Sequence, residues 1–421
     1  MKFIHTADWH LGNSMHDIDR SKESEEFLKW LKGQIVETGA EALVVAGDIF
    51  DTVNPSIEAR KQYYRFMASL LETKCRNVVV VGGNHDSGNM LDAPSELLDA
   101  LDIHVVGSVN NRKIEDLVHE LKNDSGETIA ICCSVPFVRD LELNDLYKDA
   151  KQESAESLLK QLYADAYAVA QTMRGNRDVP IIATGHLYAA GLKGKDNEES
   201  MDSESGLRDI VGCLGNVAVD TFGKDFDYVA LGHIHYATTV AGNERVRYSG
   251  SPFVMGFDEA NRKHGVLLVD LECNAAPTVQ RLDVPETIRF VQISGDLNTL
   301  KEKLRKLETE LGKNPMPTYV DVILESGDAV NLSDALGAFE SGKYFTIKRH
   351  RFSRSLLRQS GSAVKEVVGS VDQYSPEDYF KMLIASDEGL DLDSQDAKDL
   401  AEKYMPLFRE ALALAPNAEE V

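Results

Sequence analysis

The sequence predicts a layered α/β fold, in which strands that are covered on both faces alternate with helices. Short apolar segments of strand length recur from the N-terminus, and they are continuously apolar where a half-exposed strand would alternate. Continuous apolar character is typical of strands buried on both faces. Segments with apolar residues at helical spacing lie between them, and this alternation favours an α/β architecture.

The expected strands and helices follow one another through the first 240 residues. The strand candidates are residues 3–4, 42–46, 78–81, 129–131, 181–183 and 228–231. A helix is expected over 22–38, where apolar residues recur at helical spacing and Gly39 follows as a stop. Asn54-Pro55 is expected to begin the next helix, as an N-cap followed by proline at the first helical position.

The rest of the chain is expected to form smaller regions. Residues 189–206 are rich in Gly, Lys, Asp, Glu and Ser, and this composition predicts a long loop. Residues 288–350 predict a small α+β domain of a strand, a helix (300–311), a strand (318–324), a helix (331–340) and a strand. From about 375 the pattern is helical. The expected domains are 1–285, 286–355 and 372–421.

Composition and charge exclude several classes of protein. Apolar residues make up 43% and charged residues 27%, without an apolar stretch long enough for a bilayer or the regions of a signal peptide. The five cysteines form no C-x-x-C pair, so we expect a soluble cytoplasmic protein with reduced thiols. The net charge of −24 argues against a simple DNA-coating protein. Bound divalent metals can reverse the sign of the local field, so the net charge does not exclude a nuclease.

Five short polar motifs each follow an apolar strand. They are Asp8-Trp9-His10, Gly47-Asp48-Ile49-Phe50-Asp51, Gly83-Asn84-His85-Asp86, Gly185-His186 and Gly232-His233-Ile234-His235. Polar groups at the carboxyl ends of sheet strands meet in one crevice. Collected there, these motifs supply carboxylate, amide and imidazole groups, a mixed set that suits divalent metals.

The spacing within the motifs fits this interpretation. Residues i and i+2 of an extended chain face the same side, so Asp8 and His10 can bind one ion together. His233 and His235 can likewise face one site, each serving a different ion. A glycine precedes most of the motifs, which allows tight turns and close approach.

Each motif alone also has a plain structural explanation, because such segments form turns or surface strands by chance. The ordered set of five favours metal binding. Trp9 is expected to pack near the site, and His5 is expected either in the core or behind a ligand. Asp51 and Asp86 either orient ligand histidines or stabilise turns. A basic cluster at 348–354 is either a solvated face or a contact for phosphate backbone.

The order D-x-H, G-D-x-x-D, G-N-H-[DE], G-H and G-H-x-H resembles that of the calcineurin-like metallophosphoesterases. Within this superfamily, residues 5–12 (HTADWHLG), 47–51 (GDIFD) and 248–252 (YSGSP) are similar to the SbcD nuclease branch. The similarity covers about 1–285. It implies a core of two sheets flanked by helices, followed by a small α+β capping domain and C-terminal helices.

The resemblance also implies two divalent metal ions, with manganese as the first choice and magnesium, iron or zinc as alternatives. The first ion would take Asp8, His10, Asp48 and His235. The second ion would take Asp48, Asn84, His186 and His233. His85 would be the catalytic residue, which contacts the scissile phosphate and stabilises negative charge or protonates the leaving oxygen.

The implied function is a metal-dependent DNA nuclease, acting as exonuclease and endonuclease on DNA ends and hairpins in repair, recombination and replication. Its implied partners are DNA, a second copy of the chain and an SbcC-type ATPase with a coiled coil, in a heterotetramer. The C-terminal helices would either bind that coiled coil or fold back on the α+β domain. The alternative function is a stand-alone phosphatase or phosphodiesterase for a small molecule or phosphoprotein. A non-catalytic scaffold would lack ligands, and none is missing.

Overall fold

The computed structural model describes residues 1–148, 153–189, 217–326 and 344–353, together with isolated positions from 336 onward. The predicted helix 331–340, the C-terminal helices and all but the first residue of the predicted loop 189–206 lie outside the described residues, apart from those positions. The chain separates into two compact units, and the first consists mainly of Met1–Gln292. No helix among the described residues combines the length and apolar character needed to cross a membrane.

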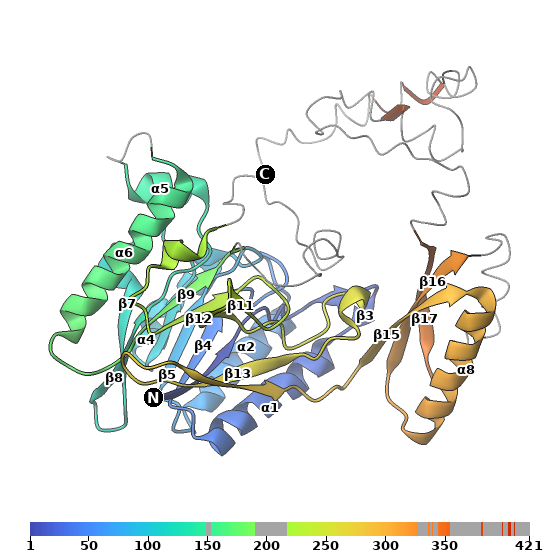
Figure 1. Cartoon of the computed structure of the whole chain (residues 1–421), viewed down its shortest axis with the longest axis horizontal. Helices are drawn as coiled ribbons and strands as arrows, with labels where there is room; N and C mark the ends of the chain where they lie inside the picture. Colours follow the sequence, from blue (N-terminus) through green and yellow to red (C-terminus); the bar gives the residue numbers. More distant parts are fainter. Residues whose placement is uncertain are drawn as a thin grey trace. The chain divides into compact units, whose positions relative to one another are not determined.

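Two six-stranded sheets form the core of the first unit (Figure 1). The first sheet has the order β14 (Thr278–Asp283), β13 (Gly265–Asp270), β1 (Lys2–Thr6), β4 (Ala42–Ala46), β5 (Asn77–Val81), β6 (Ile103–Val106). The second has the order β11 (Thr238–Val240), β12 (Asn243–Tyr248), β10 (Tyr228–Gly232), β9 (Ile181–His186), β8 (Thr128–Cys133), β7 (Val118–Lys122). The central strands of each sheet are parallel. This arrangement confirms the predicted two-sheet α/β core.

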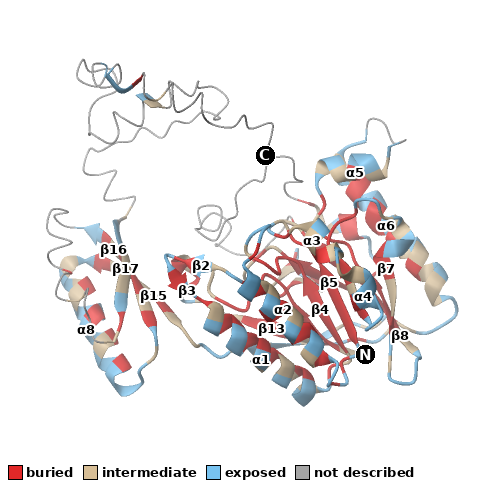
Figure 2. Ribbon diagram, turned by 180° about the vertical axis from the view of Figure 1, so that it is seen from behind, coloured by how far each residue is buried: buried red, intermediate tan, exposed pale blue. Residues whose placement is uncertain are grey.

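Alternate residues of the central strands point into different cores. In β4, Val44 packs in the cluster between the sheets, whereas Leu43 and Val45 pack in the cluster beneath the helices. Every residue of β4 and β5 is buried, as the strands in Figure 2 show. Burial on both faces is the physical reason why these strands are continuously apolar.

Helices cover the outer face of each sheet. The helices α1 (Ser21–Thr38) and α2 (Ile57–Leu70) pack on the first sheet, and α6 (Ala155–Arg174) packs on the second. The predicted stop of α1 is confirmed, because Gly39 adopts a left-handed φ of 67°. The predicted start of α2 at Asn54-Pro55 is wrong by two residues: the Ser56 side chain accepts the Ala59 N–H and is the cap.

A three-stranded sheet follows the core, made of β15 (Arg289–Asp296), β16 (Thr318–Ser326) and β17 (Thr346–Phe352). The helix α8 (Leu297–Lys313) connects the first two strands, as the pattern predicted. The described part of the basic cluster lies on β17, and whether it contacts phosphate stays a prediction. The described cysteines are free thiols.

Candidate metal centre

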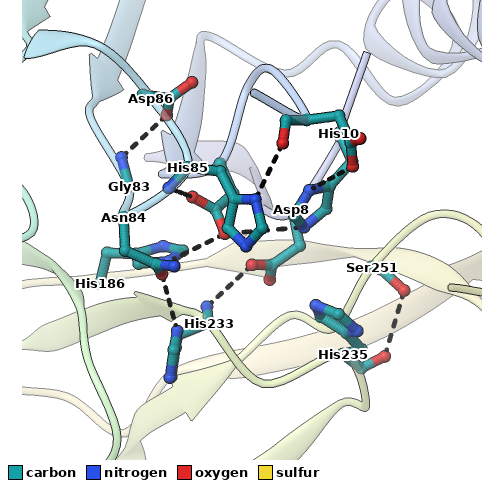
Figure 3. A network of polar contacts seen from close by, with 12 residues as sticks. Asp8, His10, Gly83, Asn84, His85, Asp86, His186, His233, His235 and Ser251 are labelled. Atoms are coloured by element: carbon teal, nitrogen blue, oxygen red, sulfur yellow. Dashed lines mark hydrogen bonds and ion pairs between the residues drawn. The ribbon is translucent and has the colours of Figure 1, made fainter. Parts of the chain in front are cut away.

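The candidate ligands meet where strands of both sheets end, and Figure 3 shows them around one crevice. Asp8 and His10 follow β1, Asp48 follows β4, Asn84 follows β5, His186 ends β9, and His233 and His235 follow β10. Segments that are more than two hundred residues apart in sequence are therefore neighbours here. The structure brings together all seven predicted ligands, and His85 lies beside them.

The backbone of the crevice adopts conformations that are uncommon outside glycine. Positive φ angles occur at Asp8 (54°), His10 (42°), Asp48 (51°) and His233 (96°). Such conformations cost about 1–3 kcal/mol each and persist only where the surrounding structure holds them. Hydrogen bonds between the two loops do so: Asp8 N–H donates to the Gly47 carbonyl at 3.0 Å, and His10 N–H donates to the Asp48 carbonyl at 3.0 Å.

Two glycines allow the backbones around the ligands to approach closely. A Cβ atom at Gly83 would lie 2.1 Å from Asp48 Oδ1, and a Cβ atom at Gly232 would lie 1.9 Å from the Ala46 carbonyl oxygen. Any side chain at these positions would displace the ligand loops. The close approach predicted from the glycines in the motifs is therefore confirmed at Gly83 and Gly232.

One group of donor atoms surrounds the amide of Asn84. Its Oδ1 lies 3.0 Å from both His186 Nε2 and His233 Nδ1, and His186 Nε2 lies 3.3 Å from Asp48 Oδ2. The other nitrogen of His186, Nδ1, lies 2.9 Å from the Ala46 carbonyl oxygen. Because a carbonyl can only accept, Nδ1 carries a hydrogen and Nε2 is the nitrogen directed at the crevice.

A second group consists of Asp8, His10 and His235, whose donor atoms all lie within 4.8 Å of one another. Asp8 Oδ2 and both His10 nitrogens are buried without a hydrogen bond from any described residue. Asp48 Oδ2 lies 3.6 Å from His10 Nε2, and it is the same oxygen that approaches His186. One carboxylate oxygen thus stands between the two groups, an arrangement suited to two neighbouring cations.

A chain of polar contacts supports His10 from behind. Asp51 Oδ1 lies 3.4 Å from His10 Nδ1 and accepts a hydrogen bond from Asn13 Nδ2 at 2.8 Å. The buried Arg20 donates to Asn13 Oδ1 at 3.3 Å and pairs with Glu23 at 2.6 Å. Of the two predicted roles for Asp51, these contacts favour orientation of a ligand histidine.

Asp86 has the other role. Its carboxylate accepts backbone N–H groups from Ile49, Phe50 and Gly83, at 3.1, 2.9 and 2.8 Å. It therefore ties the loop after β4 to the loop after β5, and its hydrogen bonds with the described residues reach no ligand histidine. Trp9 and His5 are both buried, with Trp9 donating to Thr6 and His5 contacting Tyr228, which agrees with packing of Trp9 and with the core position that was one of the two predicted for His5.

Glu259 is a site residue that the sequence did not reveal. Its Oε1 lies 3.2 Å from His235 Nδ1, and the residue is buried at the end of η3 (Phe257–Glu259). No motif surrounds it, so only tertiary structure identifies its role. Ser251, within the 248–252 segment, donates its N–H to the His235 carbonyl at 3.1 Å and fixes the same loop.

Residues 1–237 match the family model of the calcineurin-like phosphoesterases. The chain belongs to this family. It is also 34% identical to the SbcD subunit of the SbcCD nuclease from Escherichia coli K12, over 76% of this chain and 77% of the relative. The SbcD subunits of Rhodobacter capsulatus (33%; 70% and 71%) and Bacillus subtilis (32%; 79% and 81%) are similar over comparable lengths.

The resemblance to SbcD nucleases is thereby confirmed as homology over most of the chain. The chain is a hydrolase of the phosphoesterase family, and its clusters of histidine and aspartate suit divalent metals. Solved structures of β-glucosidases align at TM-scores of 0.18 to 0.20, values too low to carry any argument about this fold.

Charge is distributed unevenly among the histidines of this phosphoesterase centre. Burial acts to lower the pKa of His186, but the Asp48 carboxylate outweighs it and raises that pKa to about 9. Burial is likewise outweighed at His235, where Glu259 raises the pKa to about 9. Burial and the neighbouring His186 lower the pKa of His233 to about 3. Without a metal, protons on His186 and His235 therefore balance the buried carboxylates, and a bound cation would replace them.

His85 differs from the ligand histidines because it is exposed. Its backbone N–H donates to Asp48 Oδ1 at 2.9 Å, which fixes the residue beside the shared carboxylate. Its Nδ1 lies 2.9 Å from the Asp51 carbonyl oxygen, so Nδ1 carries a hydrogen. The remaining nitrogen, Nε2, is the one available to a substrate.

Proposed function

We propose that this chain is a metal-dependent DNA nuclease that acts as the nuclease subunit of an SbcCD-like complex in DNA repair, recombination and replication. The observation that carries the proposal is the Asp48 carboxylate oxygen that stands between two groups of ligand atoms. The homology to nuclease subunits supports DNA as the substrate. In this proposal the protein acts in the cytoplasm, as an exonuclease and endonuclease on DNA ends and hairpins.

The two ions would occupy the two groups of donor atoms. Asp8, His10, Asp48 and His235 would hold the first ion. Asp48, Asn84, His186 and His233 would hold the second ion. Manganese is the first choice that the resemblance implies, with magnesium, iron or zinc as alternatives, and a mixed set of nitrogen and oxygen ligands accepts each of them. When bound, such a pair supplies positive charge that stabilises the attacking and leaving oxygens of a phosphodiester.

The residues of the chain contribute orientation and a proton. Asp51 and Glu259 would hold the rings of His10 and His235 in place through their outer nitrogens. His85, held by the Asp51 carbonyl, would present Nε2–H to the scissile phosphate. A protonated imidazole there stabilises developing negative charge or protonates the leaving oxygen.

The partners in this proposal are DNA, an SbcC-type ATPase with a coiled coil, and a second copy of the chain in a heterotetramer. Residues 372–421 would bind the coiled coil, although most of them lie outside the described residues. The rings of Phe380 and Phe408, one from each of the two expected helices, are stacked, with centroids 4.2 Å apart and planes 11° apart. Deletion of 372–421 should abolish ATPase binding but leave manganese-dependent cleavage of single strands.

The substrate class is tested by comparing duplex DNA with p-nitrophenyl phosphate, side by side and with manganese. We expect weak DNA cleavage by the chain alone, because its net charge of −24 disfavours DNA binding without a partner. Rapid hydrolysis of the monoester without DNA cleavage would overturn the proposal in favour of a stand-alone phosphatase. A truncated chain that still co-purifies with the ATPase would refute the docking role of 372–421.

A further inference from the structure

An aromatic ring borders the second group of ligand atoms from outside the five motifs. Phe137 lies in the segment between β8 and α5 (Asp140–Leu146), and its N–H donates to the Gly82 carbonyl at 2.8 Å. This bond ties the segment to the loop that carries Asn84. The Phe137 ring lies 6.3 Å from the His186 ring, with their planes at 83°. Phe137 therefore forms one wall of the crevice beside His186.

Arg139 lies over the Phe137 ring. Its guanidinium carbon is 5.8 Å from the centroid of the Phe137 ring, and the residue is exposed. No carboxylate of the described residues forms an ion pair with it. Glu142, one turn along the chain, instead accepts the Arg139 backbone N–H and the Asn110 amide, both at 2.8 Å. Within the part of the chain that the structure describes, a positive charge thus stands without an ion-pair partner beside the metal centre.

We propose that Arg139 binds the backbone phosphate next to the scissile phosphate, on the His186 side of the centre, with Phe137 as its platform. This inference rests on the proposed nuclease function. A guanidinium presents five donors in one plane and binds a phosphate through two of them. The aromatic face beneath the guanidinium orients its plane, while the N–H groups at the edge of the guanidinium stay open to solvent.

A phosphate fits this contact better than a base edge does. Among the described residues, no hydrogen bond holds the guanidinium in an orientation that would select one particular base. Contacts to phosphate position a strand without selecting sequence, which suits an enzyme that removes successive nucleotides. In a chain with 69 acidic and 45 basic residues, the loss of one such contact close to the cleaved bond should measurably weaken binding of DNA by the isolated subunit.

The test compares Arg139→Ala with Arg76→Ala in the full chain with manganese. Arg76 precedes β5 and pairs with Asp124 at 3.1 Å, so it lies at the end of the first sheet opposite the crevice and carries the same charge. For a single-stranded oligonucleotide, we expect Arg139→Ala to raise KM about tenfold and to reduce the slope of log(kcat/KM) against log salt by about one. Arg76→Ala should change neither quantity.

Two further measurements distinguish a phosphate contact from a structural role. Hydrolysis of bis-p-nitrophenyl phosphate, which has no neighbouring phosphate, should be unchanged in Arg139→Ala. Arg139→Lys, which keeps the charge without the fork of donors, should retain the salt slope with an intermediate KM. Equal losses on both substrates, or an Arg139→Ala variant that matches Arg76→Ala, would overturn the inference. A wild-type chain that cleaves no oligonucleotide would overturn the nuclease proposal and this contact with it.

Discussion

Two clusters of histidine and aspartate in this protein have similar composition but different construction. One is the candidate metal centre, and the other consists of Asp99, His104 and His119, whose donor atoms also lie within 4.8 Å of one another. In the second cluster, His104 Nδ1 lies 2.5 Å from Asp99 Oδ1, and the Asp99 side chain is 62% exposed. The rings of His104 and His119 are stacked, with centroids 4.5 Å apart and planes 13° apart.

The comparison shows that the orientation of the histidine rings distinguishes a set of metal ligands from side chains that are merely close to one another. A histidine binds a cation in the plane of its ring, and two stacked rings cannot both direct a nitrogen at one point between them. His119 Nε2 is also buried without a hydrogen bond among the described residues, so an unpartnered atom alone does not identify a metal site. In the metal centre, carbonyl and carboxylate groups fix the outer nitrogens, and Asp48 joins two groups.

The largest expected effect is that of Asp48→Ala. Both groups of ligands share this carboxylate, so the variant should lose both ions and all measurable cleavage. Bound manganese can be counted by elemental mass spectrometry on the purified chain. Retention of two tightly bound ions would contradict the ligand assignment, whereas Asp99→Ala serves as the matched control and should leave the count unchanged.

His85→Ala should separate metal binding from chemistry. The side chain is exposed and belongs to neither ligand group, so both ions should remain while cleavage falls by about 10²–10⁴-fold, as for loss of a general acid. His104→Ala, from the second cluster, should leave the rate unchanged. A loss of less than about tenfold in His85→Ala would show that His85 has another role.

Manganese affinity should depend on pH because protons compete for His186 and His235. The pKa of each is raised to about 9 in the metal-free protein, so both are protonated below that pH and must lose a proton when an ion binds. Affinity should therefore fall as the pH falls, by about tenfold per pH unit for each displaced proton. Calorimetry in buffers of different ionisation enthalpy counts these protons, and binding without proton release would disprove the mechanism.

Glu259→Gln should weaken the first ion without removing it. Glu259 contacts the outer nitrogen of His235, and loss of such a partner typically reduces metal affinity by about 10–100-fold. Titration with manganese should show one weakened and one unchanged site. Asp258→Asn removes a neighbouring charge that forms no ion pair with His235 and is the control; equal effects of the two variants would point to general electrostatics.

Asp99→Ala should have the smallest effect. The Asp99–His104 pair lies at the surface, and exposed ion pairs contribute about 0–1 kcal/mol to the free energy of unfolding. Thermal unfolding should therefore change by only a few degrees, without a change in cleavage. A third bound ion that disappears in this variant would show that the second cluster does bind metal and would remove the contrast between the two clusters.

The sequence by itself determined the class of the fold and most of the site. Continuous apolar strands such as 42–46 identify burial on both faces, because a strand must be apolar on every face that it buries. The five motifs place polar groups after such strands, and the ends of strands are where a sheet collects them. The ordered set therefore predicts seven candidate ligands and His85, which the structure brings to one crevice.

Only the tertiary structure decided which groups stand behind the ligands. Glu259 and Arg20 carry no motif, and they reach the centre through contacts with residues that are distant in sequence. Asp51 and Asp86 look equivalent in their motifs, yet one supports His10 and the other ties two loops together. The structure also decided that Ser56 is the N-cap of α2, because the sequence alone does not show which residue before the helix accepts its first N–H groups. The local sequence pattern indicates which residues a strand or helix must bury. The side-chain contacts across the crevice depend instead on how segments that are distant in sequence pack together.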